Sequence, residues 1–132
     1  MKRNEENFSL TNTTKGKLPS LPFSEMKNAV LGKSYILSLV FITEQKSKEL
    51  NSTYRKKNKG ANVLSFPLSK KEGEIFICVA VAKRQCKDFD KTWQKFVGFL
   101  VIHGMLHLKG YDHSSIMESL EKKYDQKYLS RN

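Results

Sequence analysis

Residues 89–113 read FDKTWQKFVGFLVIHGMLHLKGYDH. From Phe89 onward the apolar side chains recur at intervals of three and four residues, which is the spacing of an α-helix with a buried face. We therefore expect a helix that begins at about Phe89 and is the most deeply buried in the protein. Gly110 is suited to the left-handed position that ends such a helix. The stretch thus predicts a core helix with two histidines, followed by a turn with a third.

Strands and helices follow one another irregularly along the rest of the chain. Apolar, β-branched runs between turn residues predict strands, and capped stretches of helix formers predict helices. The predicted strands cover residues 8–10 (at an edge), 35–42, 62–67 and 74–82. The predicted helices cover residues 24–31, 43–54, 89–109 and 114 to nearly the end of the chain. Because this order is no strict strand–helix–strand repeat, we predict an α+β domain with one small mixed sheet flanked by helices.

Particular residues mark several of these boundaries. The hydroxyls of Ser24 and Thr43 are suited to helix N-caps. Pro67 would end the third strand, because proline has no N–H for a sheet ladder. The run EIFICVAVA at 74–82 is apolar and rich in β-branched residues, so we expect a central strand buried on both faces. Cys78 would be a small buried thiol in that strand.

The composition limits the class of protein. A chain of 132 residues is the size of one domain, so we treat residues 1–132 as a single unit. Lysine and arginine total 24 against 13 aspartates and glutamates, and the net charge of +11 attracts polyanions such as nucleic acid or an anionic membrane. The longest apolar runs fall far short of the ~20 residues that span a bilayer. The amino terminus is polar where a signal peptide would be apolar, so we expect a cytoplasmic protein without a membrane span.

All three histidines of the chain lie within HGMLHLKGYDH, residues 103–113. On a helix, His103 and His107 project from one face, and a turn at Gly110 brings His113 back toward them. One histidine alone would be interpreted as a core residue, but three at this spacing favour a metal site. Imidazole nitrogens suit zinc, and three protein ligands leave one position open, as in catalytic zinc sites. We predict one zinc ion per chain, with a purely structural zinc as the alternative.

The histidine spacing is also that of the metzincin proteases, which carry a glutamate directly after the first histidine as general base. Gly104 occupies that position here and leaves room beside the metal. A zinc hydrolase of peptides or small amides is therefore disfavoured, although the ligand spacing leaves it open. The positive charge points instead to a polyanionic substrate.

A basic segment covers residues 44–71, where eight lysines and arginines accompany two glutamates. Charge alone is more typical of a solvated loop than of a binding site. Arg55 differs because it ends a predicted helix, where its planar guanidinium can bind a phosphate through two hydrogen bonds. The lysines that follow would attract an RNA backbone more diffusely, and they are Lys56, Lys57 and Lys59. Asn62 and Ser65 flank the next strand and either add hydrogen bonds to the substrate or serve as turn residues.

With both segments in view, the chain resembles the YbeY family of bacterial endoribonucleases, which act in ribosomal RNA maturation. HGMLHLKGYDH at 103–113 fits the family's histidine motif throughout, and ELNSTYRKKNKGANVLSFP at 49–67 fits its second motif. The resemblance extends from the strand at 35–42 to the closing helix. It departs at Asn58, Ala61 and Glu74, where the family usually has aspartate, threonine and aspartate. None of these three is a predicted metal ligand.

The resemblance implies a small mixed sheet flanked by helices, with zinc held in a cleft by His103, His107 and His113. It also implies that Arg55 is important for ribonuclease activity. We accordingly predict Arg55 and His103 as catalytic residues, and Arg55 with Lys56, Lys57 and Lys59 as substrate-binding residues. In such a site zinc either activates a water molecule or polarises the scissile phosphate, and the sequence leaves both roles open.

The implied function is a zinc-dependent, single-strand-specific endoribonuclease that acts in ribosomal RNA maturation, at the 3′ end of the small-subunit RNA, and in ribosome quality control. Its expected partners are RNA and the ribosome or ribosomal proteins, and a monomer is favoured. The alternative function is a non-catalytic, RNA-binding ribosome-assembly factor with a structural zinc. Two residues near His113 stay ambiguous: Asp112 either handles protons beside the metal or caps the last helix, and Tyr111 either packs or stacks on a base.

Overall fold

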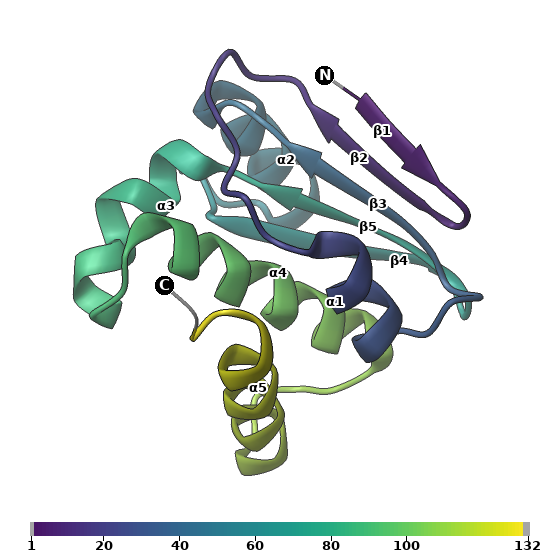
Figure 1. The fold of residues 1–132 in the computed structure, drawn as a ribbon. Helices are drawn as coiled ribbons and strands as arrows, with labels where there is room; N and C mark the ends of the chain where they lie inside the picture. Colours follow the sequence, from purple (N-terminus) through teal and green to yellow (C-terminus); the bar gives the residue numbers. More distant parts are fainter. Residues whose placement is uncertain (1, 131–132) are drawn as a thin grey trace.

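A five-stranded mixed β-sheet lies at the centre of the protein (Figure 1). The computed structural model describes residues 2–130. The strands are β1 (Lys2–Glu5), β2 (Phe8–Asn12), β3 (Ile36–Phe41), β4 (Val63–Ser69) and β5 (Glu72–Ile77), in the spatial order β1-β2-β3-β5-β4. β2, β3 and β5 are parallel, whereas β1 and β4 run antiparallel to their neighbours at the two edges. The predicted mixed sheet in a single α+β domain is confirmed.

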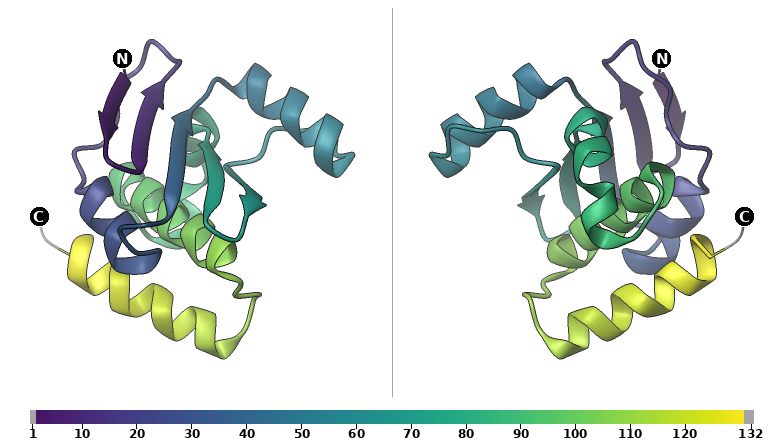
Figure 2. Two further views of the ribbon diagram at one scale, coloured as in Figure 1. Left: turned by 90° about the vertical axis from the view of Figure 1, so that its right-hand side faces the viewer. Right: turned by 90° about the vertical axis from the view of Figure 1, so that its left-hand side faces the viewer.

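Helices pack on both sides of this sheet. They are α1 (Phe23–Val30), α2 (Glu44–Arg55), α3 (Val79–Gln85), α4 (Trp93–Lys109) and α5 (Ser115–Tyr128), with a short 3₁₀ helix at Cys86–Phe89. α4 packs on β4 and β5, and α1, α3 and α5 pack on α4. Figure 2 shows α2 projecting on the side of the sheet away from α1. Within residues 2–130, no helix has the length and apolar character needed to cross a membrane.

α4 is the core helix, as its periodicity predicts. Phe96, Val97, Val101, Ile102 and Met105 are fully buried on it, against the equally buried inner faces of β3 and β5. The predicted start at Phe89 is wrong, because that residue ends the 3₁₀ helix instead. Asp90 then adopts a left-handed conformation, and the hydroxyl of Thr92 caps α4 by accepting from the Lys95 N–H. The helical backbone is therefore interrupted between Phe89 and Trp93, although the spacing of apolar residues in the sequence continues across this point.

The strand predicted at 74–82 is half wrong. β5 ends at Ile77, and the apolar residues after it begin α3 at Val79. Cys78 is buried as predicted, but it occupies the position before α3 and not a strand. Only alternate residues of β5 are buried, so the strand has one buried face and not two. A short run of valine and alanine such as VAVA at 79–82 is compatible with either a strand or a helix with one buried side, and this ambiguity caused the error.

Other boundary predictions were wrong at the amino-terminal end and at Pro67. The strand at 8–10 is not at an edge, because β1 covers it. Ser24 lies inside the first turn of α1 and does not cap it; its hydroxyl donates to Oε2 of Glu5 at 2.5 Å. Pro67 does not end β4, which continues to Ser69. As an edge strand, β4 tolerates a residue without an N–H.

The predicted cap at Thr43 and the predicted stop at Gly110 are confirmed, and the structure adds a cap at Ser114 that was not predicted. Thr43 caps α2 by accepting from the Lys46 N–H at 3.2 Å, and Ser114 caps α5 by accepting from the Met117 N–H at 3.2 Å. Gly110 ends α4 at φ +109°, a left-handed conformation that glycine adopts without strain. These termini matter for function, because the end of α2 and the end of α4 carry the candidate site residues.

Candidate metal centre

His103 and His107 lie one turn apart on α4, and their rings project from the same face. Their Nε2 atoms are 3.0 Å apart. The ring of His113, which lies in the turn between α4 and α5, is 5.1 Å from each of the other two rings. One nitrogen from each of the three rings lies within 4.8 Å of the others. The three histidines are therefore close enough to bind one metal ion, as their spacing predicts.

The turn that returns His113 toward α4 is built around Gly110. Its N–H donates to the His107 carbonyl, and the Tyr111 N–H donates to the Leu106 carbonyl, so the last carbonyls of α4 keep partners. The left-handed glycine reverses the chain before α5 begins. As a result His113 is exposed while His103 and His107 are partly buried. The site opens to solvent on the side of the turn.

Two hydrogen bonds orient the rings on α4. Nδ1 of His103 lies 2.6 Å from Oε2 of Glu121 on α5, and Nδ1 of His107 lies 3.0 Å from the Tyr111 carbonyl oxygen. Carboxylate and carbonyl oxygens accept, so the ring N–H of each histidine is on Nδ1. This tautomer leaves the lone pair of each Nε2 atom directed at the common point. A histidine that binds a metal through one ring nitrogen usually donates the N–H of the other nitrogen to a carboxylate or carbonyl oxygen.

These contacts fit a bound cation. Two Nε2 lone pairs facing each other at 3.0 Å repel unless a positive charge lies between them. Zinc bonds of about 2.0–2.1 Å in a tetrahedral arrangement would place two nitrogens roughly 3.3 Å apart, close to the observed spacing. Burial, reinforced by the neighbouring His103, lowers the pKa of His107. The ring is thereby kept in the neutral form that binds metals.

The histidines form one wall of a cleft of about 460 Å³. The opposite wall comes from the edge strand β4 and the last residue of α2, and the full lining is Arg55, Asn62, Val63, Leu64, Ser65, Phe66, His103, His107 and His113. Arg55 therefore shares a cleft with the predicted metal ligands, although 47 residues of chain separate Arg55 from the nearest of them. The exposed lysines 56, 57 and 59 follow Arg55 outside the lining of this cleft.

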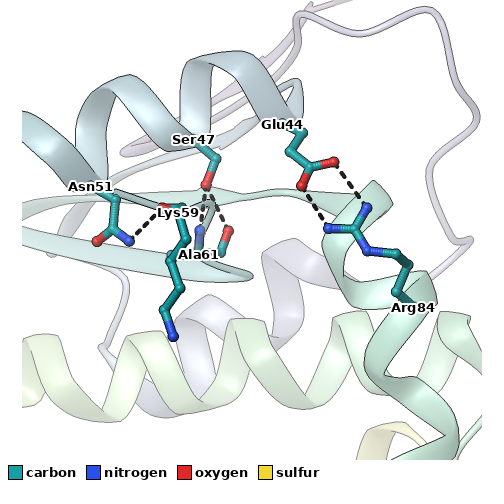
Figure 3. Close-up of polar contacts among 6 residues, drawn as sticks. All are labelled: Glu44, Ser47, Asn51, Lys59, Ala61 and Arg84. Atoms are coloured by element: carbon teal, nitrogen blue, oxygen red, sulfur yellow. Dashed lines mark hydrogen bonds and ion pairs between the residues drawn. The ribbon is translucent and has the colours of Figure 1, made fainter. Parts of the chain in front are cut away.

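Two buried polar residues of α2 hold the loop that follows Arg55 (Figure 3). The hydroxyl of Ser47 donates to the Ala61 carbonyl at 2.7 Å and accepts from the Ala61 N–H at 2.8 Å. Nδ2 of Asn51 donates to the Lys59 carbonyl at 2.8 Å. Lys56 adopts a left-handed conformation at the end of α2, which starts the return. These bonds at Lys59 and Ala61 hold the far end of the loop against α2.

An ion pair on the same helix joins α2 to α3. The guanidinium of Arg84 binds the carboxylate of Glu44 through two hydrogen bonds of 2.9 and 2.6 Å (Figure 3). The Arg84 side chain is well exposed, so the pair is worth little in free energy.

Glu121 is the site residue that the sequence interpretation missed. It is 9% exposed on α5, one turn after the buried Met117. A glutamate on the apolar side of an amphipathic helix is itself a signal, because a buried carboxylate needs a partner. The sequence prediction for Gly104 also needs correction, since a Cβ there would lie 2.8 Å from Oγ of Ser65 and 3.2 Å from Ile75. The absent side chain lets α4 approach the sheet and does not leave room beside the metal.

The ambiguous neighbours of the site are also placed. Asp112 is exposed and does not cap α5, because Ser114 does. Tyr111 packs against the hydrophobic core and contributes its carbonyl to His107. Nδ2 of Asn62 donates to Gln85 at 2.7 Å, and the hydroxyl of Ser65 donates to the Gly104 carbonyl at 3.3 Å. Asn62 and Ser65 thus make structural hydrogen bonds while also lining the cleft.

Known proteins resemble this chain in sequence and in fold. A protein called Endoribonuclease YbeY from Staphylococcus carnosus is 36% identical over 108 residues, which cover 73% of this chain and 71% of that protein. Proteins of the same name from Staphylococcus aureus strains are 36% identical over 99 residues, which cover 64% of this chain and 64% of the relative. The match to the S. aureus proteins thus spans just under two thirds of their length.

A solved structure and a family model extend the comparison to nearly the whole chain. The solution structure of TM1509 from Thermotoga maritima superposes with a TM-score of 0.64 at 30% identity, covering 89% of this chain and 85% of that one. The family model described as Endoribonuclease YbeY matches residues 3–130, which include both sequence motifs and all three histidines. The chain therefore belongs to the Endoribonuclease YbeY family.

Proposed function

We propose that this protein is a zinc-dependent endoribonuclease that cuts single-stranded RNA during ribosomal RNA maturation. The endoribonuclease name of its relatives supports an RNA-cleaving role. The proposal extends to processing of the 3′ end of the small-subunit RNA and to ribosome quality control. It places the protein in the cytoplasm, as a monomer that acts on or near the ribosome.

The observation that carries the proposal is that Arg55 and the three histidines line one cleft. His103, His107 and His113 would hold the zinc ion. When bound, zinc supplies Lewis-acid chemistry for hydrolysis of a phosphodiester. Arg55 faces the same space with a guanidinium that can bind phosphoryl oxygens and stabilise the charge that develops on them. His103 serves as a ligand whose orientation is held by Glu121.

Electrostatics support RNA as the substrate. The net charge of +11 favours a polyanion, and Lys56, Lys57 and Lys59 are exposed directly after Arg55. These lysines would guide the backbone of the strand toward the cleft, while Arg55 would contact the phosphate to be cut.

The proposal is tested by RNA cleavage with purified protein of measured zinc content. Arg55→Ala should fold and bind about one zinc per chain yet lose RNA cleavage by roughly a hundredfold or more, because a preorganised charge at the reacting phosphate is worth several kcal/mol. His107→Ala should lose both zinc and cleavage. Arg84→Ala is the matched control, since it removes an exposed arginine that lies outside the cleft.

The same variants separate an enzyme from the non-catalytic assembly factor. If His107→Ala unfolded while Arg55→Ala supported ribosome assembly at the normal level, a structural zinc in an RNA-binding protein would be the better account. Full RNA cleavage by Arg55→Ala would contradict the role proposed for that residue.

A further inference from the structure

Tyr54 has an unusual environment for a large aromatic side chain. It is 65% exposed, more than any other large hydrophobic residue in the described part of the chain. Its ring nevertheless has a defined neighbour, because it lies 5.2 Å from the ring of Phe66 at an angle of 60°. The ring of Phe66 in turn lies 5.8 Å from that of Phe76 on the adjacent strand. Tyr54 is therefore supported from beneath by packed rings while much of its own surface faces solvent.

This pair of rings adjoins the candidate metal centre. Tyr54 directly precedes Arg55, and both Arg55 and Phe66 line the cleft that holds the histidines. The basic residues of the following loop are exposed next to them, at Lys56, Lys57 and Lys59. An exposed aromatic surface is thus combined with a phosphate-binding guanidinium and a run of positive charge.

Nucleic-acid strands carry both features that such a surface would recognise. A phosphate binds arginine and lysine, and an unpaired base presents a flat π-face that stacks on an aromatic ring. We propose that Tyr54, supported by Phe66, stacks on an unpaired base of the RNA strand whose phosphate is bound by Arg55. This inference rests on the proposed function and adds a binding site to it.

The inference explains how the cleft would select single strands. In a duplex each base is stacked on both faces and paired at its edge, so its π-face is not available to Tyr54. Lysines and arginine alone would bind the phosphates of either form. Discrimination between single-stranded and duplex RNA should therefore depend on Tyr54 more than on the lysines.

Binding can be measured with a short single-stranded RNA that carries 2-aminopurine at one internal position. Rapid mixing with the zinc-loaded protein records the fluorescence change before cleavage proceeds. Tyr54→Ala should weaken binding by roughly 5- to 150-fold, as expected when one base–aromatic stack is lost, and should abolish the quenching of 2-aminopurine. Tyr54→Phe should retain both. Phe89→Ala is the control, since Phe89 is 51% exposed and does not line the cleft.

An RNA with an abasic site at the tested position should bind the unmodified protein as weakly as the intact RNA binds Tyr54→Ala. Duplex RNA should bind the unmodified protein and Tyr54→Ala equally. Equal affinity of the two proteins for the intact single strand would overturn the stacking site and leave the proposed function standing. Failure of the unmodified protein to bind any RNA would overturn the proposed function and the stacking site together.

Discussion

Nδ1 of His103 on α4 and Oε2 of Glu121 on α5 are joined by a hydrogen bond of 2.6 Å. Both side chains are largely buried, with 18% and 11% of their surface exposed. The contact couples the packing of two helices to the direction of a predicted metal ligand, because it fixes which nitrogen of His103 carries the proton. α5 therefore supports the candidate metal centre without supplying one of its predicted ligands.

Glu121→Gln should weaken zinc binding by about 10- to 100-fold, the usual effect of losing the partner of a metal-binding histidine. Glutamine keeps the size of the side chain but removes its charge. Zinc affinity is measured by competition with a chromophoric chelator. Glu118→Gln, on the first turn of the same helix and exposed, is the control. An unchanged zinc affinity in Glu121→Gln would show that the carboxylate does not support the ligand.

The clustering of the three histidines was predictable from their spacing along the chain. His103, His107 and His113 lie on one helix and its terminating turn, so local rules for helices and glycine were sufficient. Glu121 was not predicted, because its contact depends on how α5 packs back on α4. Arg55 was associated with the histidines through the family motif alone, since its position in the cleft depends on the long-range pairing of β4 with β5.

The fold class was predictable, and one error lies where a short apolar run fits two structures. Residues 74–82 contain the end of a strand and the start of a helix without any polar residue or glycine between them. β1 was missed because Lys2–Glu5 has no apolar pattern and is a strand only through pairing with β2. Ser24 is predicted to cap α1, but its hydroxyl donates a hydrogen bond to the carboxylate of Glu5 instead. The errors at β1 and Ser24 reflect tertiary contacts that override local preference.

Gly104→Ala should destabilise the protein. The added Cβ would lie 2.8 Å from Oγ of Ser65 and 3.2 Å from Ile75, and such overpacking costs about 1–3 kcal/mol. This cost opposes a gain of about 1 kcal/mol when alanine replaces glycine inside a helix. Denaturant unfolding measures the net change. Combining Gly104→Ala with Ser65→Ala should recover part of the loss because it removes the nearest contact, while zinc stoichiometry stays unchanged. A Gly104→Ala variant that gained the full ~1 kcal/mol expected for alanine in a helix would contradict the close approach of α4 to the sheet.

Ser47→Ala should loosen the loop beside Arg55. It removes both hydrogen bonds between the Ser47 hydroxyl and the backbone of Ala61, and leaving such groups unpaired costs about 1–3 kcal/mol. Amide hydrogen exchange at Ala61 should accelerate strongly, and the free energy of unfolding should fall by that amount. Ser52→Ala tests the specificity of the effect, because Ser52 is on the same helix but exposed. If exchange at Ala61 were the same in both variants, Ser47 would not be the residue that anchors the loop.

Lys27 predicts a dependence of stability on pH. The residue is fully buried on α1, where its ammonium donates to the Lys33 carbonyl at 3.1 Å, and burial lowers its pKa below the ordinary value of 10.5. Between the lowered pKa and 10.5, the unfolded chain holds a proton at this site that the folded chain has released. The free energy of unfolding therefore gains a contribution that rises with pH across that interval.

Lys27→Met removes this titration while keeping a side chain of similar length. Near neutral pH the folded unmodified protein must bury the charged ammonium. The free energy of unfolding of Lys27→Met should therefore exceed that of the unmodified protein by the largest amount there. The difference in unfolding free energy between the two proteins should then shrink as the pH rises toward about 10. Urea denaturation at a series of pH values measures it, and taking the difference cancels the titration of all other groups. A difference that stays constant with pH would mean that the ammonium is charged and equally solvated in the folded and unfolded chains.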